Sequence, residues 1–163
     1  MKGNSVSKDI ATTYLIGFEV IQNQFSSFRQ AAIRKYAEDE SSNQGVKAVF
    51  ADSGCLQFHL FGMYVDVFFE PVVVSKVERA VFGRIKFVHR RCGLNCLLME
   101  LLVSLEGRVF RPCGKPDILG QEYGTIGDEQ WRLHTDFDKD LAAALLNLYV
   151  HGESPQAYWD SQH

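Results

Sequence analysis

Residues 55–68, CLQFHLFGMYVDVF, alternate apolar and polar side chains on both sides of a two-residue turn signal, Phe61-Gly62. Because successive strand residues point to opposite faces, this alternation is typical of a β-hairpin with one buried and one solvated face. The register set by the turn places these apolar side chains on one face: Leu56, Phe58, Leu60, Met63, Val65 and Val67. It leaves these polar side chains on the other: Gln57, His59, Tyr64 and Asp66. The hairpin therefore predicts an antiparallel sheet whose apolar face is covered by other elements.

Further strand patterns flank this hairpin and predict a meander of about six antiparallel strands over residues 46–111. Residues 78–91 alternate again, with basic side chains on one side. Residues 94–105 fit either a helix or a strand, because leucine, methionine and glutamate are good helix formers. The turn pattern and apolar strand pattern that follow favour a strand.

Two amphipathic helices are predicted outside the sheet. Apolar side chains recur every three or four residues from Asp9 to Glu40, although a strand or a kink at Gly17 also fits the threonine-rich part before it. A second helix is predicted after Thr135, with Gly152 as its stop. We therefore expect one α+β domain over residues 1–163, in which both helices cover the apolar face of the sheet.

Composition indicates a globular chain of ordinary character. Of the 163 residues, 46% are hydrophobic and 23% are charged. No apolar window approaches the roughly 18 residues of a membrane span, and the first ten residues lack the apolar core of a secretory signal. These observations predict a cytoplasmic protein that is not embedded in a membrane, with residues 1–8 and 153–163 as peripheral tails.

The polar face of the hairpin is the best candidate for a catalytic site. His59 is predicted to lie opposite Tyr64 and diagonal to Asp66, so that an imidazole could act as a general base in a small hydrolase or ligand-binding enzyme. The alternative interpretation is a solvated sheet face. No cofactor-binding motif is recognised, and no cofactor is expected.

A zinc site is a weaker alternative, built from His89, Cys92, Cys96 and Cys113. Thiolates and imidazoles are the ligands that zinc prefers. However, structural zinc usually takes two closely spaced cysteine or histidine pairs, and here one pair is missing. We expect the four cysteines to be reduced thiols and no metal to be bound.

Charge is unevenly distributed along the chain. Residues 76–115 carry nine basic and three acidic side chains, whereas residues 116–163 carry two basic and nine acidic ones. The basic strand over 79–91 is an alternative nucleic-acid surface, but a sequence pI near 5.9 and the shortage of stacking aromatics make that partner unlikely.

The acidic last third favours a protein partner. Residues 112–131 contain four glycines and predict a long loop, of a kind that often carries function. The predicted contact residues are Asp128, Glu129, Trp131, Asp136 and Asp140. We therefore expect a non-enzymatic protein-binding domain, such as an acidic inhibitor or immunity protein that masks the active site of a basic toxin or nuclease.

Overall fold

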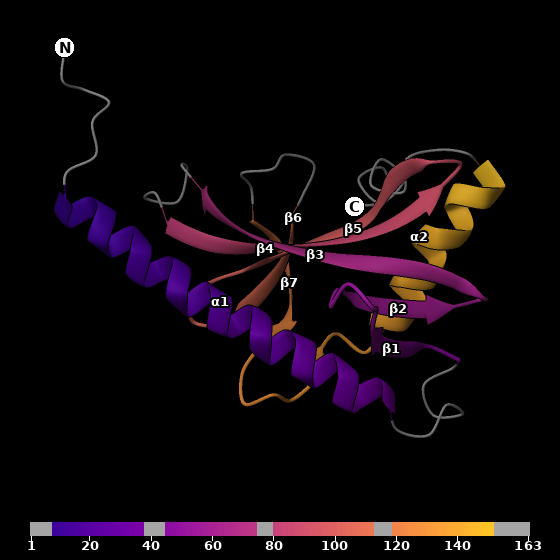
Figure 1. Cartoon of the computed structure of the whole chain (residues 1–163), viewed down its shortest axis with the longest axis horizontal. Helices are drawn as coiled ribbons and strands as arrows, with labels where there is room; N and C mark the ends of the chain where they lie inside the picture. Colours follow the sequence, from indigo (N-terminus) through magenta and orange to yellow (C-terminus); the bar gives the residue numbers. More distant parts are fainter. Residues whose placement is uncertain (1–7, 38–44, 75–79, 113–118, 152–163) are drawn as a thin grey trace, which may run out of the picture.

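The computed structural model describes residues 8–37, 45–74, 80–112 and 119–151, which form an α+β fold with two helices and an antiparallel sheet (Figure 1). The predicted tails and the predicted helix stop at Gly152 lie outside these ranges, apart from Lys8. The elements are α1 (Lys8–Ala37), β1 (Lys47–Phe50), β2 (Leu56–Leu60), β3 (Met63–Val74), β4 (Ala80–Arg91), β5 (Leu94–Val103), β6 (Arg108–Pro112), β7 (Leu119–Thr125), β8 (Arg132–Leu133) and α2 (Phe137–His151). The α+β class and the antiparallel meander are confirmed.

The sheet has eight strands in the order β1 to β8, rather than about six. Its two additional strands, β7 and β8, lie within or just after the stretch predicted as a loop. Gly124 explains the difference, because a Cβ atom there would lie 2.4 Å from the Arg132 carbonyl oxygen. This glycine allows two backbones to approach each other within a sheet and does not mark a loop.

The β2–β3 hairpin has the predicted register. His59 pairs with Tyr64, and Phe58 pairs with Val65. Phe61 and Gly62 have φ angles of 56° and 72°, the pattern of a type I′ turn, whose twist matches that of the flanking strands. The apolar side of the hairpin is in the core, as expected from its alternation.

Helix α1 is continuous through residues 12–17. The alternative predictions for this segment, a strand or a kink at Gly17, are therefore wrong. The Thr12 and Thr13 hydroxyls donate hydrogen bonds to the carbonyls of Lys8 and Asp9, which keeps both side chains compatible with a helix. Gly17 lies on the buried side, where a Cβ atom would be 3.1 Å from Val81. The glycine therefore serves helix–sheet packing.

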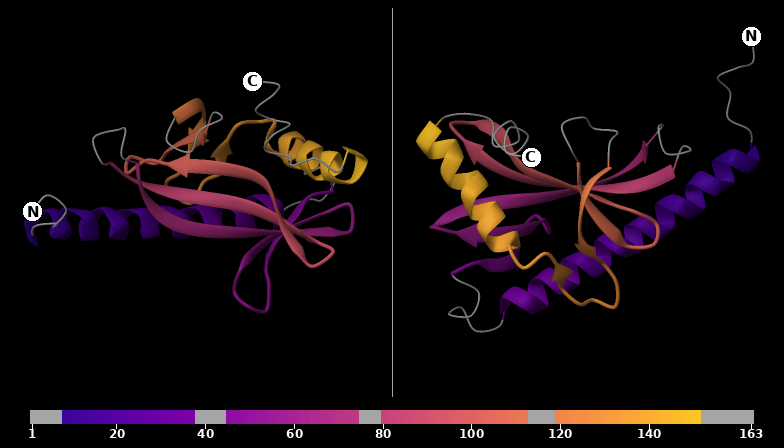
Figure 2. Two further views of the ribbon diagram at one scale, coloured as in Figure 1. Left: turned by 90° about the horizontal axis from the view of Figure 1, so that it is seen from above. Right: turned by 180° about the vertical axis from the view of Figure 1, so that it is seen from behind.

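Both helices pack on the inner, apolar face of the curled sheet, and the N-terminal turns of α1 extend past the sheet (Figures 1 and 2). The core stripe of α1 includes Ile21, Phe25 and Phe28, each no more than 1% exposed. Phe25 fits over Gly83 of β4, where a Cβ atom would lie only 2.5 Å from its ring. In the part of the chain that the structure describes, no helix is long and apolar enough to span a bilayer.

Residues 94–103 form strand β5, as favoured above. Their nearly continuous apolar character arises because both faces of β5 are packed. Met99 and Leu101 belong to the main core, whereas Leu102 is buried against Phe82 on the outer face. A strand packed on both faces loses the alternation that normally distinguishes it from a helix.

Candidate functional site

Trp131, just before β8, is held by an aromatic cluster. Its ring centroid lies 5.3 Å from those of Phe28 and Tyr36, 5.1 Å from that of Phe137 and 6.4 Å from that of Phe58. These rings come from α1, β2 and α2. Because core rings occupy fixed rotamers, the indole has a fixed position where the cluster meets the surface.

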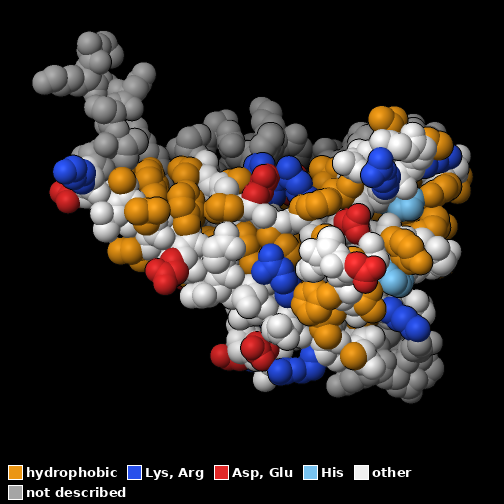
Figure 3. Space-filling view, in the orientation of Figure 1, with side chains coloured by type: hydrophobic (Ala, Val, Ile, Leu, Met, Phe, Trp, Pro, Cys, Tyr) orange, Lys and Arg blue, Asp and Glu red, His pale blue; other side chains and the backbone are white. Residues whose placement is uncertain are grey.

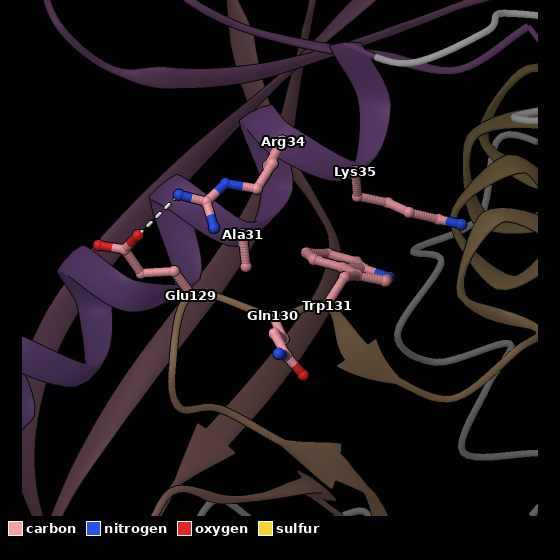
Figure 4. A pocket seen from close by; sticks show the side chains of 6 residues that line it. All are labelled: Ala31, Arg34, Lys35, Glu129, Gln130 and Trp131. Carbon is pink, nitrogen blue, oxygen red and sulfur yellow. Dashed lines mark hydrogen bonds and ion pairs between the residues drawn. The ribbon is translucent and has the colours of Figure 1, made fainter.

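A hollow of about 370 Å³ lies beside this indole (Figure 4). Its lining residues come from the last turns of α1 and from the β7–β8 connection: Ala31, Arg34, Lys35, Glu129, Gln130 and Trp131. The hollow therefore combines an aromatic surface with a carboxylate, an amide and two basic groups. Of these groups, aromatic side chains and arginine are enriched at protein–protein interfaces, whereas lysine and glutamate are depleted there.

The wall of the hollow that carries Glu129 is a tight turn. Asp128 and Glu129 have φ angles of 53° and 54°, and the Gln130 N–H donates a 3.2 Å hydrogen bond to the Gly127 carbonyl. These features are the pattern of a type I′ turn. Its two central residues both occupy the left-handed region.

This turn is unusual because its second central residue is not glycine. The comparable turns at residues 61–62 and 92–93 end in Gly62 and Gly93, which adopt positive φ without strain. Aspartate tolerates this region moderately well, but glutamate is seldom found there. Backbone strain of this kind clusters at functional sites, so the turn points to a role for the Glu129 side chain.

Glu129 is directed at α1. Its Oε2 atom lies 2.9 Å from Nη2 of Arg34, as Figure 4 shows by a dashed line. The Asp128 side chain is 83% exposed and lies 4.0 Å from the Arg132 guanidinium. Exposed ion pairs of this type contribute only about 0 to 1 kcal/mol to stability, so both carboxylates can change partners at little cost.

Two further aspartates at the start of α2 bond to tyrosines. The Tyr36 hydroxyl donates to Asp138, and the Tyr123 hydroxyl donates to Asp140. Burial, followed by these hydrogen bonds, raises the pKa of both tyrosines well above the usual range, and burial also raises the pKa of Asp138. Asp140, a predicted contact residue, therefore serves to join β7 to α2.

The structure brings only some of the predicted contact residues together. Glu129 and Trp131 line the same hollow, and Asp128 precedes Glu129 in the turn. Asp136 is exposed just before α2, whereas Asp140 points to Tyr123. The hollow itself is therefore the better-defined candidate.

The sequence did not predict four members of the site: Ala31, Arg34, Lys35 and Gln130. Arg34 lies in the last turn of α1, where a basic residue is expected simply because it complements the helix dipole. Its ion pair with Glu129 joins residues 95 positions apart in the sequence. No local pattern could have revealed that pairing.

On the alternative catalytic face, His59 lies opposite Tyr64 as expected, and its imidazole contacts the Gln57 amide. Nε2 of His59 lies 2.7 Å from Oε1 of Gln57, and Gln57 donates a 2.8 Å hydrogen bond to Asp66. The His59 ring also packs at a tilt against the Tyr64 ring, with centroids 4.3 Å apart. Because an amide oxygen can only accept a hydrogen bond, Nε2 of His59 carries the proton. Asp66 therefore acts on the imidazole only through the Gln57 amide, which does not titrate.

We expect the pKa of His59 to lie below the usual value for histidine. Desolvation lowers the pKa of its imidazole, and the positive charge of Lys47 adds to that effect. As the pH falls below 6.5, the unfolded chain therefore binds this proton before the folded chain does, and the folded state loses stability until the folded pKa is passed. An NMR titration of the His59 ring protons measures the pKa. A His59→Gln variant should lack this part of the pH dependence, and an unchanged profile would contradict the expectation.

In the alternative zinc site, His89 and Cys96 are cross-strand partners in β4 and β5, but both ring nitrogens of His89 have other partners. Nδ1 of His89 is 2.8 Å from the Tyr64 carbonyl oxygen, and Nε2 is 2.6 Å from the Tyr149 hydroxyl. Cys92 is exposed in a turn, and Cys113 lies outside the described residues. Within the ranges described, no group of three potential metal-ligating side chains is present.

The basic side of β4 is largely neutralised by acidic residues from neighbouring strands. Arg84 lies 2.6 Å from Glu100 and 3.1 Å from Glu70, and Lys86 also lies 3.1 Å from Glu70. The hydrogen bond from Lys86 is the largest factor that lowers the pKa of Glu70. A phosphate backbone would have to displace these carboxylates, which disfavours the nucleic-acid alternative.

Comparison with known proteins adds no identification. No family model matches this chain, and no curated protein or solved structure is significantly similar to it. The hollow beside Trp131 and the strained turn that borders it are therefore the features that bear on function.

Proposed function

We propose that this chain is a non-enzymatic protein-binding domain that recognises a basic partner at the hollow beside Trp131. The observation that carries the proposal is the Asp128-Glu129 turn, where two acidic residues occupy a conformation that glycine would adopt more easily. This strained turn places the Glu129 carboxylate at the rim of the hollow beside Trp131. Selection for fold stability alone favours Asn-Gly at these positions.

The contact is expected to work by exchange of ion pairs. A lysine or arginine of the partner enters beside the Trp131 indole, where its cation is attracted by the ring and by Glu129. Arg34 releases Glu129 and remains exposed to solvent. Because the Arg34–Glu129 ion pair is exposed and weak, its loss costs little free energy. Trp131 supplies the aromatic anchor that central interface residues usually provide.

The partner best suited to such a contact is a basic toxin or nuclease whose active site is masked on binding. Residues 116–163 carry two basic and nine acidic side chains, and such a field accelerates encounter with a basic surface. The exposed carboxylates of Asp128 and Asp136 lie in this part of the chain and would contribute to that field. Association should accordingly weaken as salt is added.

Replacing Asp128-Glu129 by Asn-Gly tests the strain and the binding role together. We expect the double variant to be more stable than the parent by about 0.5 to 1 kcal/mol, because Asn-Gly suits a type I′ turn. We also expect it to lose binding to arginine-containing hexapeptides, since the carboxylate has been removed. Denaturant unfolding gives the stability, and NMR chemical shifts of the Trp131 side-chain N–H report peptide binding.

Glu129→Gln is the matched control, because it keeps the backbone strain and removes only the charge. It should leave stability within about 0.5 kcal/mol of the parent and still lose peptide binding. If arginine peptides shift the Trp131 resonance equally in the parent and in both variants, the acidic turn is not the recognition element. A response to glutamate peptides of equal size would also contradict the proposal.

A further inference from the structure

The first half of α1 carries a second stripe of residues on the side away from the core. Lys8, Thr12, Leu15 and Glu19 recur at intervals of four, three and four residues, so they share one face of the helix. All four are exposed. This spacing is the one by which two helices pack along their length.

The centre of this stripe is apolar although it faces solvent. Leu15 is 66% exposed and its neighbour Ile16 is 59% exposed. Figure 3 shows hydrophobic side chains gathered over this part of α1, with charged atoms at the tip of the helix and again farther along it. The outer side of a surface helix is normally polar, so an apolar centre between two charges indicates a contact surface.

The two charges identify the occupant. Lys8 and Glu19 have opposite signs and lie equally far from the midpoint between Thr12 and Leu15. They are eleven residues apart, about 16 Å along the axis, so they cannot neutralise each other within one chain. A surface with this arrangement is complementary to an antiparallel copy of itself.

We propose that the first half of α1 pairs with the same segment of a second copy of this chain, in antiparallel orientation about a two-fold axis. Lys8 then lies opposite Glu19 of the second copy, and Thr12 lies opposite its Leu15. Because the contact is isologous, each favourable pair occurs twice. The Leu15 and Ile16 side chains become covered at the centre.

The pairing leaves the proposed partner site open. Arg34 lies 19 residues beyond Leu15, about 28 Å along α1. The dimer therefore presents two hollows, and a partner with two basic sites gains from binding both. A contact of a few helical turns is smaller than a standard stable interface, so we expect a reversible dimer whose population depends on concentration.

A charge swap in the full chain provides the test. Lys8→Glu places two like-charge pairs in the dimer, and so does Glu19→Lys, so each variant should raise the dimer dissociation constant by about tenfold or more. The double variant restores both attractions and should dimerise like the parent. An equimolar mixture of the two single variants should form a heterodimer. Sedimentation velocity between 5 and 500 µM measures each outcome.

Two further variants separate this contact from an exposed apolar surface on α2. Leu15→Ser with Ile16→Ser should leave a monomer, whereas Leu146→Ser with Val150→Ser should leave the dimer unchanged, since these α2 residues are exposed but are not part of the pairing. Circular dichroism confirms that each variant is folded. The proposal is overturned if the parent is monomeric at 500 µM. It is also overturned if the Lys8→Glu/Glu19→Lys double variant does not dimerise like the parent, or if only the α2 variant dissociates the dimer.

Discussion

Replacing Gly83 by alanine is expected to lower the free energy of unfolding by about 2 to 3 kcal/mol. A Cβ atom at this position would lie 2.5 Å from Cε1 of Phe25 and 3.0 Å from Ile21. Both side chains are completely buried, and Phe25 also packs on Phe69 with ring centroids 5.0 Å apart. The Phe25 ring therefore cannot move aside without disturbing a second contact. Urea unfolding at equilibrium measures the effect.

A double-mutant cycle shows whether Phe25 is the cause. Phe25→Leu removes the ring that meets the new methyl group, so Gly83→Ala should be less damaging in that background by about 1 kcal/mol or more. Gly127→Ala is the control, because no atom lies within 4 Å of a Cβ atom there. If the two substitutions are additive, or if Gly83→Ala is as mild as Gly127→Ala, α1 does not pack on β4 as described.

Phe58→Ala is expected to lower the free energy of unfolding by about 3 to 5 kcal/mol. The Phe58 ring is fully buried at the centre of the aromatic cluster, 5.5 Å from Tyr36, 5.6 Å from Phe137 and 6.4 Å from Trp131 between centroids. Its loss creates a cavity that three elements border. Because Trp131 also packs on Tyr36 and Phe137, we expect rings that move into this cavity to displace the indole from its position in the hollow.

The Phe58 variant should therefore change the site as well as the stability. In a Trp159→Phe background, the fluorescence of Trp131 should shift to longer wavelength as the indole becomes more solvated. Phe68→Ala is the matched control, since this ring is 48% exposed on the outer face, and it should change stability by less than about 1 kcal/mol. An unshifted emission spectrum with normal peptide binding would show that the cluster does not position Trp131.

The elements predicted best are those whose signal is local. The β2–β3 hairpin follows from alternation and a two-residue turn, and both act within a dozen residues. The core side of α1 follows from the spacing of its apolar residues, and α2 begins two residues after the predicted cap at Thr135. In each case the local sequence pattern and the tertiary packing favour the same structure, so the element can be predicted from a single sequence.

The parts that were mispredicted or missed depend on contacts between distant residues. Glycines in the stretch 112–131 predict a loop, yet Gly124 allows β7 to approach β8. Trp131 and Glu129 were identified from their chemistry, but Arg34 completes the hollow from another element. The hydrogen bonds that link His59 to Asp66 through Gln57 likewise join residues of two strands. Such pairings become visible only when the fold is known.

The order of elements along the chain has a consequence for synthesis on the ribosome. Each strand pairs with its neighbour in sequence, so the meander can grow as the chain emerges. Helix α1 emerges first, but Val81 and Gly83, which pack against Gly17, Ile21 and Phe25, follow more than 40 residues after Ala37. At ordinary elongation rates, roughly 2 to 10 seconds pass between the synthesis of α1 and the synthesis of these β4 residues. During that time the nascent helix exposes apolar surface on both its sides, and we expect chaperones that act at the exit tunnel to bind it.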